Sequence, residues 1–227
     1  MTVCGANEFL FAGDKFGNVK QISLKTDDPI HSYNKVHHTG VMQLKSTPDG
    51  KFVYSSCRDG QLKRLDVEKK DFSYDFGKIH DGFISGLCVT PDNKYVLTSG
   101  KVGYLKQWSV EDNSLVLDYG RVHDAAILSL EVSNDGHFVF SGDTKGALKQ
   151  WNLDTMKLHK NYGKIHDYPV NHISITSNNK WFFTSDRCGF LKQYDVKDGI
   201  CLKDYGKIHE KAIFKFTCQP EVLLDMA

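Results

Sequence analysis

The sequence predicts an all-β fold built from about five copies of one four-stranded antiparallel unit. Three residue types recur along the 227-residue chain at a constant spacing, which equals the distance in sequence between His37 and His80. The series are His37, His80, His123, His166 and His209; Gly17, Gly60, Gly103, Gly146 and Gly189; and Lys20, Lys63, Lys106, Lys149 and Lys192. No insertion or deletion interrupts these series, so the copies are expected to pack against one another equivalently.

Each copy contains the pattern of four short strands. In the copy that starts at His123, residues 128–132 alternate apolar and polar side chains, which predicts a strand with one buried face. The turn-forming residues 133–136 follow, and the continuous apolar run 138–141 predicts a strand covered on both faces. Residues 147–153 predict a third strand, and a less apolar fourth strand ends at Tyr162.

A four-stranded unit of roughly 40–45 residues is the period of a β-propeller blade, which buries its two faces by stacking on its neighbours. We expect one propeller domain over residues 1–227, with blade units 37–79, 80–122, 123–165 and 166–208 and a last blade shared between 209–218 and 1–36. The C-terminal strand is expected to join the N-terminal blade and close the ring, because closure removes exposed sheet edges. An open arc completed by another chain is the alternative.

These repeated residues resemble the WD-repeat family. The family places a His before the first strand of a blade, a Ser or Thr in the second, an Asp in the next turn and a Trp in the third. The resemblance implies that these side chains form a hydrogen-bonded tetrad that stiffens the blade. The matching residues are His37, Ser55 and Asp59; His80, Thr98 and Trp108; His123, Ser141 and Trp151; and His166, Thr184 and Tyr194. The chain departs from the family in having the tetrad Asp only as Asp59, and in having five blades where seven are usual.

Composition argues against several function classes. With 40% hydrophobic residues, 25% charged residues and a net charge of +1, the chain has no global field that would recruit nucleic acid or anionic lipid. No apolar run has the length of a membrane span, and the first residues lack the pattern of a signal peptide. The six cysteines form no CxxC pair, which favours reduced cysteines in a cytoplasmic protein without a metal or cofactor.

Recurring His, Ser and Asp residues invite comparison with a catalytic triad. A catalytic site is one constellation in one cleft, whereas this set recurs in every copy, so we predict no enzyme activity. The strand lysines are expected to be structural. A second cation series precedes each histidine by two residues (Lys35, Lys78, Arg121, Lys164 and Lys207), and the acids that follow four of the histidines are expected to neutralise it.

The function predicted is that of a scaffold or adaptor that binds a peptide or protein surface through loops at one mouth of the propeller channel. The resemblance places six candidate residues at that mouth: Lys15, Arg58, Phe83, Lys101, Tyr168 and Arg187. Basic and aromatic side chains together suit an acidic or aromatic-bearing segment. The alternatives are a lectin-like propeller that binds a glycan or an anion, and one part of a larger WD-repeat assembly. Self-association is expected if the ring does not close.

Overall fold

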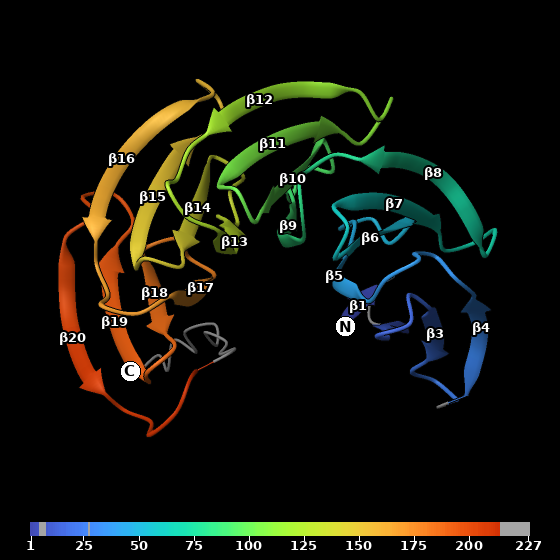
Figure 1. The fold of residues 1–227 in the computed structure, drawn as a ribbon, viewed down its shortest axis with the longest axis horizontal. Coiled ribbons are helices and arrows are strands. Elements are labelled where there is room, and N and C mark those ends of the chain that lie inside the picture. The colour runs from blue at the N-terminus through green and yellow to red at the C-terminus, as the bar shows by residue number, and fades with distance from the viewer. Residues whose placement is uncertain (5–7, 27, 214–227) are drawn as a thin grey trace, which may run out of the picture. The chain divides into compact units, whose positions relative to one another are not determined.

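In the part of the chain that the computed structural model describes, residues 1–4, 8–26 and 28–213, every regular element is a β-strand (Figure 1). The strands form five four-stranded antiparallel sheets, each composed of consecutive strands. The predicted all-β architecture of five four-stranded units is therefore confirmed. The chain divides into two compact units, Met1–Ile127 and Leu128–Ala227.

The first unit holds three sheets. The first consists of β1 (Thr2–Cys4), β2 (Phe9–Gly13), β3 (Val19–Ser23) and β4 (Pro29–Tyr33). The second consists of β5 (Val41–Ser46), β6 (Phe52–Cys57), β7 (Gln61–Asp66) and β8 (Asp71–Lys78). The third consists of β9 (Ile84–Val89), β10 (Tyr95–Gly100), β11 (Tyr104–Ser109) and β12 (Leu115–Arg121).

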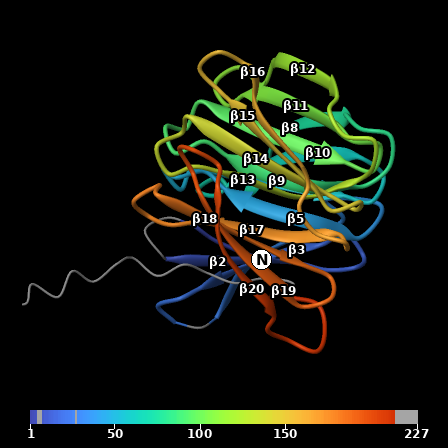
Figure 2. The ribbon, with the colours of Figure 1, turned by 90° about the vertical axis from the view of Figure 1, so that its left-hand side faces the viewer.

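The second unit holds two sheets. The fourth sheet consists of β13 (Ile127–Val132), β14 (Phe138–Asp143), β15 (Ala147–Asn152) and β16 (Lys157–Lys164). The fifth consists of β17 (Val170–Ile175), β18 (Trp181–Asp186), β19 (Phe190–Asp195) and β20 (Cys201–Lys207). Figure 2 shows this last sheet in orange and red, with β20 as an edge strand.

The repeated glycine of the series that includes Gly103 is required by both backbone conformation and space. Gly103 has a φ of +82°, which side chains with a Cβ rarely adopt, and a Cβ there would lie 2.1 Å from the carbonyl oxygen of His123. The backbone nitrogen of His123 donates to the carbonyl oxygen of Gly103 at 3.2 Å. The glycine thus lets the loop that carries the repeat histidine dock on the turn between β10 and β11.

Neighbouring sheets within each unit bury apolar side chains against each other in the same way. Phe11 and Val19 of the first sheet pack with Leu44, Val53 and Leu65 of the second. Equivalent clusters join the second sheet to the third and, in the other unit, the fourth sheet to the fifth. The same positions of each repeat therefore form the contacts between neighbouring sheets, as expected because a blade cannot bury both of its faces alone.

A polar side chain in the middle of each third strand, buried in the first four sheets, adds hydrogen bonds to this packing. Gln150 accepts a hydrogen bond from the Tyr162 hydroxyl at 2.8 Å, and its Nε2 donates to the carbonyl oxygen of Val196 in the next sheet at 3.5 Å. The second sheet has Arg64 and Phe76 at the equivalent positions, and Arg64 Nη1 donates to the carbonyl oxygen of Val110 at 2.8 Å. This series was not predicted, although it follows the strand lysine by one residue in every copy.

The predicted ring closure concerns residues 209–218, of which 214–218 lie outside the described residues. In the described part, Thr2, Val3 and Cys4 pair with β2 as the innermost strand of the first sheet. The four strands of that sheet thus all come from the N-terminal segment. The shared last blade stays a prediction.

Candidate functional site

The third sheet shows how the repeated histidine, hydroxyl and aromatic side chains meet. The Nε2 atom of His80 lies 2.9 Å from the Thr98 hydroxyl, and Trp108 Nε1 donates to the same hydroxyl at 3.1 Å. Because the hydroxyl accepts from Trp108, it can donate to an unprotonated Nε2. Burial, helped by the nearby Lys106, lowers the pKa of His80 to about 4, so the imidazole is neutral at neutral pH.

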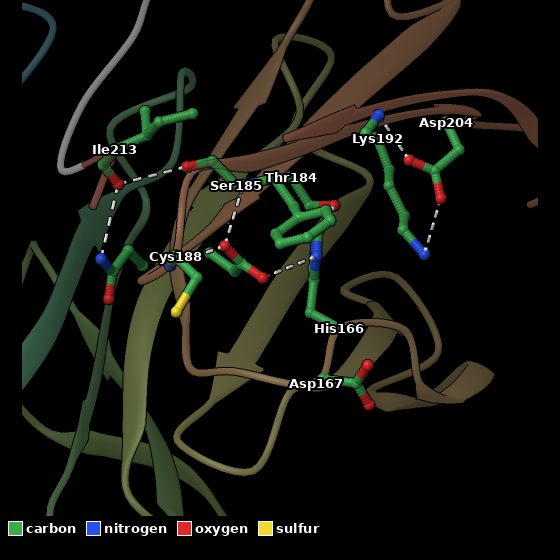
Figure 3. A network of polar contacts seen from close by, with 12 residues as sticks. His166, Asp167, Thr184, Ser185, Cys188, Lys192, Asp204 and Ile213 are labelled. Atoms are coloured by element: carbon green, nitrogen blue, oxygen red, sulfur yellow. Dashed lines mark hydrogen bonds and ion pairs between the residues drawn. The ribbon is translucent and has the colours of Figure 1, made fainter. Parts of the chain in front are cut away.

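The fifth sheet adds a carboxylate to this arrangement (Figure 3). His166 Nε2 lies 2.9 Å from the Thr184 hydroxyl, and His166 Nδ1 lies 3.5 Å from Oδ2 of Asp186. Asp186 Oδ1 accepts the backbone N–H groups of Cys188 at 2.8 Å and Phe190 at 3.0 Å. Burial lowers the pKa of His166, and the adjacent carboxylate of Asp186 opposes that shift.

The structure corrects the predicted position of the repeat carboxylate. Asp59 is exposed in the turn between β6 and β7 and is not part of a buried network. Among the described residues, the buried carboxylates are those of Asp143 and Asp186, which end β14 and β18 and lie two residues earlier in the repeat than predicted. From there a carboxylate reaches the turn N–H groups, as Asp143 reaches those of Lys145 and Ala147. The sequence contained a sign of this position, because Asp14, Asp143 and Asp186 occupy the same place in their repeats.

The remaining predicted tetrad residues occupy the expected repeat positions. His37 lies 2.9 Å from the Ser55 hydroxyl, and Trp151 Nε1 donates to the Ser141 hydroxyl at 3.1 Å. His123 is buried at the corresponding position. Tyr194 replaces the tryptophan in the fifth sheet and stacks on Phe182, with ring centroids 5.0 Å apart. The stabilising role of these residues stays a prediction.

Replacing Asp186 by asparagine is expected to lower the free energy of unfolding by about 1–3 kcal/mol, because a buried network loses its charged acceptor. Asp59→Asn is the matched control, and its effect should stay within about 0.5 kcal/mol because the side chain is exposed. Urea denaturation of both variants measures the difference. If Asp59→Asn lowered the free energy of unfolding as much as or more than Asp186→Asn, Asp59 would have the structural role predicted for it.

Asp186, His166 and Thr184 have the order of a catalytic triad, yet the hydroxyl is not placed to attack a substrate. The Thr184 side chain is fully buried. A nucleophile must reach the reacting carbon, so the buried Thr184 hydroxyl acts as a hydrogen-bonding group. Among the described residues no group of three or more His, Cys, Asp or Glu side chains could hold a metal ion. No helix in the described part of the chain could span a membrane.

The repeated cations form local ion pairs. The loop cations Lys78 and Lys164 lie 3.0 and 2.9 Å from the carboxylates of Asp81 and Asp167, three residues further on. The strand lysine Lys192 lies 3.2 Å from Asp204 on β20 (Figure 3). These contacts neutralise the charge of the loop series locally.

The six residues predicted to bind a partner lie in loops at the corresponding ends of their sheets. Lys15, Arg58, Lys101 and Arg187 are exposed in the turns between the second and third strands. Phe83 is half-buried, and Tyr168 is 47% exposed. Lys15, Arg58, Phe83 and Lys101 belong to the first unit, and Tyr168 and Arg187 belong to the second.

The same backbone hydrogen bond joins the two predicted loops in both units. The Lys101 nitrogen donates to the carbonyl oxygen of Phe83 at 3.1 Å, and the Arg187 nitrogen donates to that of Pro169 at 3.1 Å. Each of these basic turns is therefore held beside an aromatic loop residue. In the fifth sheet, Tyr168 follows directly on the buried His166 loop and stands in solvent.

A hollow of about 350 Å³ lies beside His166, and Tyr168, Phe190 and Asp186 contribute to its wall. A hollow of about 330 Å³ lies at the equivalent place beside His80, where Val102 and Tyr104 line it. The two walls differ in their aromatic and acidic side chains. This difference does not favour a lectin that binds one identical ligand in each blade.

Comparison with known protein families finds a match at two places in the chain. The model of the WD domain, G-beta repeat, matches residues 28–64 and 116–152. Each matched segment runs from the fourth strand of one sheet to the third strand of the next. Comparison with curated proteins gives no significant match. The two matched repeats and the five repeated four-stranded antiparallel sheets are together consistent with the WD-repeat family.

Proposed function

We propose that the chain is a non-enzymatic adaptor that binds an acidic or aromatic-bearing segment of a partner protein. The binding residues of this proposal are Tyr168 and Arg187, both in the second unit. WD40 repeats in general mediate protein–protein interactions, and the family is generally non-enzymatic.

The observation that carries this proposal is the exposed Tyr168 on the wall of the hollow beside His166. Tyr168 lies in a loop and is 47% exposed, so about half of this large aromatic side chain is accessible to a partner. The other copies have Thr39, Gly82, Ala125 and Lys211 at this position, so the repeat does not require the ring. Exposed Tyr and Arg side chains are favoured anchors of protein interfaces.

The partner's chemistry follows from the basic turn next to the ring. Arg187 is exposed beside the Tyr168 loop and can pair with a carboxylate of the partner. The neighbouring Asp167 is already paired with Lys164. We propose a cytoplasmic location for this adaptor, because the spacing of the six cysteines contains no CxxC pair.

A library of random peptides displayed on phage tests the proposal. Peptides enriched on the wild-type chain should carry Asp or Glu next to an aromatic residue. Tyr168→Ala and Arg187→Glu should each weaken the binding of such a peptide at least about tenfold, which corresponds to about 1.4 kcal/mol. Fluorescence anisotropy with a labelled peptide gives the dissociation constants.

Lys180→Glu is the matched control for Arg187→Glu. Lys180 is exposed just before β18 begins, and Arg187 follows directly after β18 ends, so the same charge reversal is made at opposite ends of one strand. The control should bind the peptide like the wild type. Loss of binding in Lys180→Glu, with Tyr168→Ala and Arg187→Glu unaffected, would place the binding surface at the other end of the sheets.

A further inference from the structure

An aspartate organises the turn between the second and third strands in three of the five sheets. In the fifth sheet, Asp186 Oδ1 accepts the backbone N–H groups of Cys188 at 2.8 Å and Phe190 at 3.0 Å. Asp14 in the first sheet and Asp143 in the fourth accept the two equivalent N–H groups in the same way. The backbone of this turn is therefore built to donate two hydrogen bonds to one carboxylate.

In the fifth sheet a histidine adds a third donor to this carboxylate. Asp186 Oδ2 lies 3.5 Å from His166 Nδ1 (Figure 3). The contact of His166 Nε2 with the Thr184 hydroxyl at 2.9 Å holds the ring in this orientation. One carboxylate has enough lone pairs to accept from the imidazole and from both backbone groups.

The turn between β10 and β11 in the third sheet has the same conformation. Gly103 has a φ of +82°, and the equivalent Gly189 has a φ of +93°. The Gly103 nitrogen donates to the carbonyl oxygen of Gly100 at 3.1 Å, which closes the turn as in the fifth sheet. The N–H groups of Val102 and Tyr104 therefore point to the same side as their equivalents beside Asp186.

His80 supplies the third donor in the third sheet. Its Nε2 lies 2.9 Å from the Thr98 hydroxyl, the same contact that orients His166. Because Trp108 Nε1 donates to that hydroxyl at 3.1 Å, the hydroxyl proton is available to Nε2. The neutral imidazole then carries its own proton on Nδ1, as a hydrogen-bond donor.

The third sheet has a glycine where the fifth sheet has its aspartate. Gly100 is two repeats before Asp186, so the chain itself provides no carboxylate to these three donors. A longer side chain would not fit, because a Cβ on Gly100 would lie 2.5 Å from the carbonyl oxygen of Phe83. In the second sheet the position is taken by Cys57, which is fully buried, and the Nδ1 atom of His37 is buried there.

Only in the third of these arrangements does a glycine leave the donors beside a hollow. The hollow of about 330 Å³ is lined by His80, Val102 and Tyr104 among others. Val102 is 37% exposed and Tyr104 is 38% exposed, so the hollow can be reached from solvent. It has room for a carboxylate and for part of the molecule that carries it.

The charges around the hollow are compatible with an anion. Lys78 lies 3.0 Å from the carboxylate of Asp81, and Lys106 lies 3.6 Å from that of Asp118. Lys106 also donates to the carbonyl oxygen of Ile79 at 3.0 Å, which holds its charge at the wall of the hollow. Each nearby acid is therefore paired with a cation.

We propose that the third sheet binds the carboxylate of a ligand, which accepts hydrogen bonds from the Val102 and Tyr104 N–H groups and from His80 Nδ1. The carboxylate belongs to an acidic side chain or to a small free acid. This site lies in the first unit, and it does not depend on the adaptor function proposed for Tyr168 and Arg187.

A titration of the full chain with sodium acetate, followed by amide ¹H–¹⁵N NMR, tests the proposal. Acetate replaces chloride at constant ionic strength. The amide protons of Val102 and Tyr104 should shift downfield and saturate, with a dissociation constant on the order of 10 mM for so small a ligand. Those of Cys188 and Phe190 are the internal control and should not respond, because Asp186 already binds them.

Asp186→Ala gives the fifth sheet the arrangement of the third. In this variant acetate should shift the Cys188 and Phe190 amides as well. A folded variant in which these amides do not respond would overturn the proposal, because the turn and the histidine would not be sufficient. In the wild type, the absence of a saturable shift at Val102 and Tyr104, or an equal shift at Cys188 and Phe190, would also overturn it.

Two capped tripeptides, with a central glutamate or a central glutamine, identify the source of the carboxylate. Tighter binding of the glutamate peptide than of acetate would assign the site to an acidic side chain of a protein. Binding of acetate and propionate without binding of the glutamate peptide would assign it to a small free acid. A glutamine peptide that bound as tightly as the glutamate peptide would overturn the proposal, since the charge would not be recognised.

Discussion

Replacing Trp151 by alanine is expected to lower the free energy of unfolding by about 3–5 kcal/mol. The indole is almost fully buried, and its Nε1 donates to the Ser141 hydroxyl at 3.1 Å. The substitution removes this apolar surface, leaves a cavity between the strands and deprives a buried hydroxyl of its donor. Urea denaturation followed by circular dichroism measures the change.

Trp151→Phe separates packing from hydrogen bonding in the same position. This variant keeps most of the buried ring and loses the N–H donor, so its cost should be about 1 kcal/mol. The binding of a peptide selected on the wild type should survive in both variants at temperatures where they are folded. Unchanged stability of Trp151→Ala, together with lost binding, would make the tetrad tryptophan a recognition residue.

Acid is expected to destabilise the fold well before its carboxylates are protonated. Burial, with the adjacent Lys63 as a smaller cause, lowers the pKa of His37 from 6.5 to about 4. Burial and Lys106 do the same for His80. Between pH 6.5 and about 4 the unfolded chain binds protons at these histidines that the folded chain does not bind. Stability is therefore fully present above pH 6.5 and falls as the pH drops through this window.

The size of this effect is about 1.4 kcal/mol per pH unit for each histidine, or on the order of 3 kcal/mol for each over the whole window. Urea denaturation at a series of pH values measures the slope. His80→Gln should be less stable at neutral pH and should show a shallower slope, because one proton-binding site is gone from the unfolded chain. A free energy of unfolding that stays constant down to pH 5 would contradict this account.

The sequence alone was sufficient to predict the fold class, because the constant spacing of the repeated residues is typical of a propeller blade. Each turn between the first two strands repeats residues such as Thr47, Asp49 and Gly50, and the structure places a turn there with Gly50 at a φ of +75°. The aromatic series Tyr33, Phe76, Tyr119, Tyr162 and Tyr205 recurs with the same period, and Tyr162 packs on the cluster that joins the fourth sheet to the fifth.

The carboxylate of the tetrad was not predicted correctly, because a family pattern gives a position in the sequence and not the direction of a side chain. Asp59 occupies the family's position, but the turn directs it to solvent. Asp186 ends its strand and turns inward, where two N–H groups and His166 surround it. The exposed fraction of a side chain could not be predicted from the sequence either. Tyr168 and Phe83 look alike as isolated aromatic residues, yet Tyr168 is exposed and Phe83 is half-buried.

Arg64 bears on how a chain of near-identical repeats avoids assembling in the wrong order. Repeat proteins misassemble when one copy takes the place of another during folding. The Arg64 guanidinium donates through Nε to the Ser73 hydroxyl at 2.9 Å and lies over the Phe52 ring, 4.2 Å from its centroid. The residues equivalent to Ser73 in the other copies, Ile30, Val116, His159 and Leu202, carry no hydroxyl group.

If β7 were inserted into another blade, the Arg64 guanidinium would be buried without the Ser73 hydroxyl that accepts its hydrogen bond. If a third strand with glutamine at this position were inserted beside Phe76, the glutamine would lack the tyrosine hydroxyl that it normally binds. Either mistake leaves a buried polar group unsatisfied, so the wrongly assembled intermediate is less stable and reopens. Arg64 thus disfavours the placement of β7 in any sheet other than the second.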